Sequence, residues 1–374
     1  MENIKLKQKD QKFKFLDFPV KRRDFISISG SFALGFMISG CSTISRSNLN
    51  RVSISQTNNY DRLLVRQKIE DMLNQLEGIG DIIKPGDRVA IKVNLTGGII
   101  RQGELPYSPI ESFQTHPEVV RAVGELVKDA GAKEIFIVDG IFDDLSYRAT
   151  GYNEIAKPLA AQLLDLNDPY PYPDFVEKEV GAGWQIYERF IFNRLLEEVD
   201  VFISLPKMKC HQSCGVTLSL KNSIGLPPTK YYDDPDNPRG SRSGMHGKRG
   251  EGRTRLAKVI TDLNIARPID LTIIDGIKTS EGGEGPWIRK TFNPKEANIL
   301  IAGKDPVATD AVAVVVMGFD PEAEDFETPF DNCENHLAMA HEYKLGTNRL
   351  NDIEIVGVEL EEVVCNFTPC PKSG

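Results

Sequence analysis

RVAIKV (Arg88–Val93), PEVVRAVGELVKDA (Pro117–Ala130) and EIFIV (Glu134–Val138) follow one another along the chain. The first and third are short runs rich in β-branched and other apolar residues, a pattern typical of buried strands. The second has apolar residues at helical spacing and is followed by Gly131, which favours a helix end. A strand, a crossover helix and a second strand predict one unit of a parallel sheet.

The same alternation of apolar strands and helices continues along most of the chain. It predicts an α/β fold, a three-layer sandwich with a mostly parallel sheet, in one domain or two lobes over residues 61–360, followed by a tail at 361–374. Residues 165–173 and 226–253 are rich in proline, glycine and charge, and the second segment is long enough for a lid. Further strands are expected at Asp200–Leu205, Leu271–Ile274, Asn298–Ala302 and Ile353–Val358, and helices at Asp61–Leu76, Tyr152–Leu166, Leu256–Ala266, Val307–Met317 and Glu334–Lys344.

Residues 1–40 have the features of an export signal. The pair Arg22-Arg23 precedes a short apolar run that ends in ISGC (Ile38–Cys41), which resembles a bacterial lipoprotein box. We therefore expect a twin-arginine signal over residues 1–40, a lipid on Cys41 and a polar tether over residues 41–60. The protein would be exported and anchored to a membrane through that lipid, facing the periplasm or the cell surface. The alternative is a buried helix with an incidental cysteine.

The composition limits the classes of partner. The 374-residue chain holds 54 acidic and 45 basic residues, a net charge of −9. Such an acidic protein argues against general nucleic-acid binding, which needs a basic face to neutralise phosphates. Binding of an anionic small molecule would need only a local group of cations. The sequence does not identify a protein partner.

The cysteine pattern limits the cofactors. Five cysteines follow Cys41, and an odd number in an oxidising compartment leaves at least one thiol free, bound to metal or paired with another chain. Cys365 and Cys370 are close enough along the chain for a local disulfide. No Cys-x2-Cys-x2-Cys run is present, so a ferredoxin-type iron–sulfur cluster has no ligand set. The twin-arginine route often serves proteins that carry a prosthetic group, which makes a metal one candidate cofactor. The sequence does not identify any other cofactor.

Polar side chains gather where the expected strands end. In an open α/β sheet the ligand crevice lies outside the carboxyl ends of the strands, so these tips should converge on one cleft. The alternative is that the polar residues at each strand end only form an ordinary turn. The residues expected to line the cleft are Lys92, Asn94, Lys207, Lys209, His211, Lys221, Asp275 and Asp305.

Five motifs in this order resemble the bacterial and archaeal family called domain of unknown function 362. They are IKVNL (91–95), THPEVV (115–120), LPKMKCH (205–211) leading to LKNSIG (220–225), IDG (274–276) and AGKDPVA (302–308). The resemblance implies a fold type and a site, in which His116 and Asn222 join the cleft residues as ligand contacts, but no established reaction. Family members often carry an attached iron–sulfur module, which this chain lacks, and Cys210 stands where the family tends to have threonine.

The segment from Lys207 to Asn222 carries the densest chemistry. A lysine there can bind phosphate or carboxylate, or react covalently if desolvation lowers its pKa. His211 can act as an acid or base or bind a metal, with Cys210 and Cys214 as soft ligands. The alternative for both cysteines is a pair of small buried thiols. A metal site would need completion by His116, His246, Asp139 or Asp275.

Two functional hypotheses follow. In the first, an enzyme or cofactor protein binds an anionic small molecule and uses Lys207, Lys209 and His211 in catalysis. In the second, a non-catalytic lipoprotein captures an anionic ligand or a metal for a partner. The glycine- and cation-rich loop of residues 227–253, which contains His246, would close over the anion, or would be a solvated disordered loop.

Overall fold

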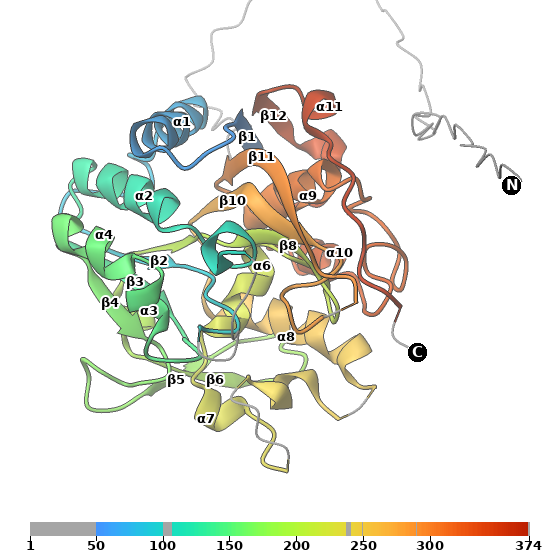
Figure 1. Ribbon diagram of the computed structural model, residues 1–374. Coiled ribbons are helices and arrows are strands. Elements are labelled where there is room, and N and C mark those ends of the chain that lie inside the picture. Colours follow the sequence, from blue (N-terminus) through green and yellow to red (C-terminus); the bar gives the residue numbers. More distant parts are fainter. Residues whose placement is uncertain (1–49, 100–106, 237–240, 249, 289, 373–374) are drawn as a thin grey trace, which may run out of the picture. The chain divides into compact units, whose positions relative to one another are not determined.

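The computed structural model describes residues 50–99, 107–236, 241–248, 250–288 and 290–372 (Figure 1). The expected export signal and Cys41 lie outside these residues. The strands are β1 (Arg51–Gln56), β2 (Arg88–Lys92), β3 (Glu134–Asp139), β4 (Gln162–Asp165), β5 (Val176–Glu179), β6 (Arg189–Phe192), β7 (Val201–Ser204), β8 (Lys207–His211), β9 (Gly215–Thr217), β10 (Leu271–Glu281), β11 (Asn293–Gly303) and β12 (Glu354–Gly357).

The helices include the longer α1 (Arg62–Gln75), α2 (Pro117–Asp129), α4 (Tyr152–Leu159), α8 (Gly252–Ala266), α9 (Pro306–Val316) and α10 (His336–Glu342). The single-turn helices are α3 (Ser146–Ala149), α5 (Leu195–Glu198), α6 (Ser219–Asn222), α7 (Thr229–Tyr232) and α11 (Leu360–Val363), with 3₁₀ turns η3 (Pro109–Glu111), η4 (Ser223–Gly225), η5 (Ser243–His246) and η6 (Leu350–Asp352).

The main sheet is mostly parallel, as expected. Its order is β12-β1-β11-β10-β7-β2-β3-β4. The predicted unit β2-α2-β3 is confirmed, with Arg88 opposite Glu134 in parallel register. β11 is the exception, because it runs antiparallel to both β1 and β10. Beyond the end of β7, β8 pairs with β10 and turns back into the antiparallel β9. β8 therefore extends the sheet at its carboxyl edge.

Helices cover both faces of this sheet, which confirms the three-layer sandwich. One core joins α1, α2 and α4 to the side of β2 and β3 that carries Val89, Ile91 and Ile137. The other core joins α8, α9 and α10 to the opposite side, which carries Ala90 and Val138. The alternation of adjacent residues between two cores follows from the two-residue period of a strand.

Three segments differ from the sequence-based expectation. The expected tether contains β1, whose apolar residues are buried between β11 and β12. The expected helix over residues 152–166 ends at Leu159, since Pro158 lies in its last turn and Ala160 adopts a left-handed conformation, and β4 follows. Within residues 226–253 the described part contains α7, η5 and the start of α8, so much of this loop is regular.

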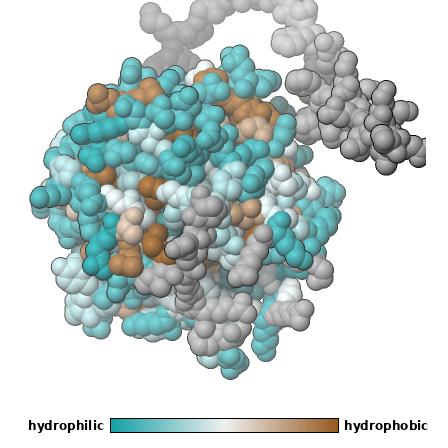
Figure 2. Space-filling view, viewed as in Figure 1, coloured by the Kyte–Doolittle hydropathy of each residue, from teal (hydrophilic) through white to brown (hydrophobic). Residues whose placement is uncertain are grey.

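The face seen in Figure 2 is mainly hydrophilic, with separate hydrophobic patches. Among the described residues, no helix is both long enough and apolar enough to cross a membrane.

Cys365 and Cys370 are free thiols, so the expected local disulfide is not formed, and Cys365 Sγ instead donates to the Val316 carbonyl.

Candidate functional site

Lys207 lies at the start of β8 and is held by an internal carboxylate. Its Nζ is 2.7 Å from Asp275 Oδ2, and both side chains are fully buried. The same ammonium group also donates to the Tyr60 hydroxyl and to two backbone carbonyls. Burial lowers the pKa of Lys207, and Asp275 opposes that shift. All of its donors are used inside the protein, so Lys207 is not available to a ligand.

Lys92, at the end of β2, is paired in the same way. Its Nζ lies 2.8 Å from Asp139 Oδ1 and also donates to Asn222 Oδ1 at 3.2 Å. The close approach requires glycine at position 225, because a Cβ there would lie 2.7 Å from Lys92 Nζ. Arg242 adds a second cation near Asp139, and burial lowers the pKa of both Lys92 and Arg242. These pairs stabilise the sheet edge from within.

Lys209 is buried at the centre of β8, and no carboxylate in the described part of the chain forms an ion pair with it. Its Nζ donates to Asn94 Oδ1 at 2.8 Å and to the Phe113 carbonyl at 2.6 Å. Burial lowers the pKa of Lys209 to about 7. Thr217 faces it across the β8–β9 pair, and its hydroxyl is buried without a hydrogen-bond partner within the described part of the chain. Lys209 can therefore gain or lose a proton near neutral pH.

Lys221 projects from α6, whose position is fixed by a buried carboxylate. Asp310 accepts from the backbone N–H groups of Ser219 and Leu220 at 2.8 and 2.9 Å, and burial raises its pKa to about 8. The side chain of Lys221 is only 9 % exposed. Its ammonium group nevertheless makes no hydrogen bond or ion pair with any residue that the structure describes. The Nζ atom is not among the enclosed polar atoms that lack a partner, so it reaches the surface and is open to an anion from solution.

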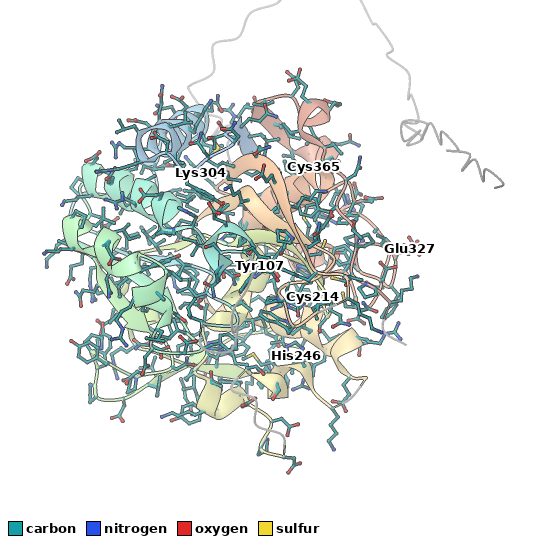
Figure 3. The ribbon with its side chains drawn as sticks, in the orientation of Figure 1. Tyr107, Cys214, His246, Lys304, Glu327 and Cys365 are labelled. Atoms are coloured by element: carbon teal, nitrogen blue, oxygen red, sulfur yellow. The ribbon has the colours of Figure 1, made fainter. Side chains whose placement is uncertain are left out.

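Three imidazoles lie close enough to Lys221 to be affected by its charge. The charge of Lys221 adds to burial in lowering the pKa of His211, of His246 (to about 4) and of His336 (to about 3). His336, the first residue of α10, is fully buried, and both ring nitrogens lack a hydrogen-bond partner among the described residues. We call Lys209, His211, Lys221, His246 and His336 the lysine–histidine cluster; Figure 3 labels His246 and the nearby Cys214.

One carboxylate borders the lysine–histidine cluster. Glu284 raises the pKa of Lys209 and of His246, opposing the effect of burial. Its two oxygens are already occupied, since Oε2 accepts from the Gln212 N–H at 3.0 Å and Oε1 from Trp287 Nε1 at 2.8 Å. Two lysines and three neutral imidazoles thus face one hydrogen-bonded carboxylate. The balance of charge favours an anion.

The soft metal-ligand set expected from Cys210, His211 and Cys214 is not assembled. Cys210 Sγ donates to the Thr368 carbonyl, and Cys214 Sγ donates to the Val216 carbonyl. Burial raises the pKa of both thiols to about 12, which keeps them protonated. Among the described residues, no group of three or more histidine, cysteine, aspartate or glutamate side chains is arranged to hold a metal ion.

Asp305 does not join the other expected cleft residues, and that prediction is wrong. Because β11 is antiparallel, its last residue Gly303 pairs with Thr272 at the start of β10, whereas Asp275 pairs with Leu300. Asp305 therefore lies at the opposite sheet edge, where it caps α9 through the N–H groups of Val307 and Ala308. In Figure 3 the neighbouring Lys304 lies toward α1, away from His246.

The remaining expected residues have mainly structural contacts. His116 caps α2, stacks on Tyr60 with ring centroids 3.5 Å apart, and donates its backbone N–H to Asp275. Asn222 links Lys92 and Asn94 through its side-chain oxygen. In the expected lid, Arg242 is buried and donates to the carbonyls of Pro227 and Gly225, so it cannot close over a ligand.

Sequence reasoning missed three contributors to the site. His336 begins α10, the helix that comes after α9. Glu284 and Trp287 lie in a glycine-rich loop. None of the three falls at an expected strand end. The SEGGEGPW segment (Ser280–Trp287) follows a strand, but its spacing gives no indication of the buried carboxylate. His336 has no local signal at all, because only the packing of α10 brings it to Lys221.

The comparisons with known proteins agree with the motifs. The family model described as "Domain of unknown function (DUF362)" matches residues 89–315. The thylakoid-associated protein sll1697 of Synechocystis sp. is 29% identical over 270 residues, which cover 72% of this chain and 75% of that protein.

Two solved structures show weaker likeness. A crystal structure of a Thermotoga maritima protein aligns with a TM-score of 0.38 and 14% identity, over 71% of this chain and 61% of that one. The lactate racemase apoprotein from Thermoanaerobacterium thermosaccharolyticum aligns with a TM-score of 0.38 and 13% identity, over 72% of this chain and 57% of that one. This chain thus spans less than two thirds of either.

Proposed function

This chain belongs to the domain of unknown function 362 family, and we propose that it binds an anionic small molecule at the lysine–histidine cluster. The observation that carries the proposal is the ammonium group of Lys221, a largely buried residue whose ammonium group has no hydrogen-bond or ion-pair partner among the described residues. A phosphate or carboxylate at this position would supply the missing negative charge and accept hydrogen bonds. The adjacent Lys209 would add a second cation.

An anion suits this site better than a metal cation. The imidazoles of His211, His246 and His336 are neutral, but two lysine side chains lie among them, and their positive charge repels a metal ion. Imidazoles can also donate N–H groups to an anion's oxygens. The orphan nitrogens of His336 and the orphan hydroxyl of Thr217 are further polar groups that a bound ligand would satisfy.

Proton transfer to or from the bound anion is the second candidate function. Lys209 has a pKa of about 7, the value at which a side chain serves equally well as acid and base at neutral pH. Lys209 and His211 would then be the catalytic residues, while Lys207 would hold the sheet edge through Asp275. A ring of cations and neutral imidazoles without proton transfer would instead make a binding protein that delivers its ligand to a partner.

Calorimetric titration with inorganic phosphate at pH 6.5 tests the binding proposal. Replacing the unpartnered lysine, Lys221→Met, should weaken phosphate binding at least tenfold, about 1.4 kcal/mol. Lys230→Met is the matched control, because Lys230 is exposed and lies over the rings of Phe175 and Tyr231. Equal phosphate affinity in the wild type and both variants, or no binding to the wild type, would overturn the proposal.

We also propose that the chain is exported and anchored through a lipid on Cys41. The support is the Arg22-Arg23 pair and the ISGC box, and a relative that carries the name thylakoid-associated protein. Metabolic labelling with a tagged fatty acid should mark the wild type and the Cys365→Ala control, but not Cys41→Ala. Label retained by Cys41→Ala would refute acylation at this position.

A further inference from the structure

A partly exposed tryptophan is folded onto the border of the lysine–histidine cluster. Trp287 is 40% exposed, and its Nε1 donates to Glu284 Oε1 at 2.8 Å. The loop can place the indole there only because position 285 is glycine, since a Cβ at Gly285 would lie 2.3 Å from the indole ring. The polar edge of the indole is satisfied inside the protein, while much of its apolar surface faces solvent.

Two short connections join this indole to the cluster. Glu284, which accepts from Trp287, also accepts from the backbone N–H of Gln212, the residue after His211. On the other side, Phe113 packs edge-on to Trp287 with ring centroids 5.8 Å apart. The carbonyl of Phe113 accepts from Lys209 Nζ at 2.6 Å. Trp287 is thus connected to Lys209 through Phe113, and through Glu284 to Gln212, the residue that follows His211.

Further rings extend the apolar surface beside Lys209. Phe292 lies 6.1 Å from Phe113, and Tyr107 lies 5.5 Å from Phe292, measured between ring centroids. An aromatic group with a satisfied polar edge and an exposed apolar part is typical of a ligand contact, because a bound ring would remove that surface from water. The ammonium group of Lys209 and this group of aromatic rings are therefore neighbours.

We infer that the ligand of the lysine–histidine cluster is a small anion that carries an aromatic ring. This inference rests on the proposed function: the phosphate or carboxylate binds at Lys221 and Lys209, and the ring packs against Trp287. Trp287 is then a specificity-determining residue that distinguishes aromatic from bare anions.

Calorimetric titration with phenyl phosphate and with inorganic phosphate tests this inference. In the wild type, phenyl phosphate should bind at least tenfold more tightly than phosphate. In Trp287→Ala the ratio should fall below threefold while the phosphate affinity stays within twofold, and Trp287→Phe should keep most of the preference. Trp184→Ala is the matched control, because Trp184 is similarly exposed, at 48%.

The outcomes separate the two proposals. Equal affinity for both probes in the wild type would overturn the aromatic preference and leave the anion site intact. A tenfold preference that survives in Trp287→Ala would remove Trp287 from ligand recognition. Failure of both probes to bind the wild type would contradict the proposed function itself, together with the inference that depends on it.

Discussion

The ammonium group of Lys207 lies 2.7 Å from the carboxylate of Asp275, whereas the ammonium group of Lys221 has no such partner in the described part of the chain. Both lysines are buried, so burial alone does not distinguish a structural lysine from a ligand-binding one. The distinction lies in whether the protein itself supplies the counter-charge. This difference predicts that replacing lysine by methionine has different effects on stability at the two positions.

Replacing Lys207 should destabilise the fold. Lys207→Met leaves the Asp275 carboxylate buried without its cation, and breaking such a pair costs about 3–5 kcal/mol of unfolding free energy. The double variant Lys207→Met/Asp275→Asn should recover part of this loss, because neither charge remains. Urea denaturation measures all three proteins. A loss below about 1 kcal/mol in the single variant would contradict a structural ion pair.

Replacing Lys221 should leave the stability of the ligand-free fold nearly unchanged. Lys221→Met removes an ammonium group that makes no ion pair within the described residues, so the unfolding free energy of the ligand-free protein should change by less than about 1 kcal/mol. Phosphate should then stabilise the wild type more than the variant, because the wild type binds the anion more tightly. Destabilisation comparable to that of Lys207→Met would mean that Lys221 has a structural counter-charge.

The pKa of Lys209 predicts a pH dependence of stability. Its pKa is about 7 in the folded protein and near its usual value of 10.5 when unfolded, so between these values the unfolded state binds more protons. The wild type should therefore gain about 1.4 kcal/mol per pH unit relative to Lys209→Met from pH 7 to 10.5, with no relative change below pH 7. Denaturation at pH 6, 8 and 9 measures this; parallel curves would contradict a depressed pKa.

His336 predicts a loss of stability in acid. Burial lowers its pKa to about 3, whereas the unfolded side chain titrates near 6.5. As pH falls below 6.5, protons bind the unfolded state first, and stability should fall by about 1.4 kcal/mol per pH unit from this residue. His336→Phe should reduce that slope, while His341→Phe on the same helix serves as the control. Equal acid slopes in the wild type and both variants would exclude a buried neutral His336.

The sequence predicted the sheet edge well because strand periodicity and strand ends are local features. The expected residues near the carboxyl ends of β2 and β7 do lie close together, since Lys209 Nζ donates to Asn94 and Lys207 Nζ pairs with Asp275. The internal partners of Lys92 and Lys207 could not be predicted, because Asp139 and Asp275 come from other strands. Asp305 was misplaced because nothing in the apolar run of β11 distinguishes an antiparallel strand from a parallel one.

Histidine-selective NMR during a phosphate titration tests the anion site most directly. The chain has five histidines, of which His211, His246 and His336 belong to the lysine–histidine cluster, while His116 and His341 provide internal controls. The imidazole nitrogen signals of the first three should shift together and saturate with one dissociation constant, and those of His116 and His341 should stay in place. Signals from the three cluster histidines that remain unmoved, or that drift without saturation together with the controls, would contradict anion binding at Lys221.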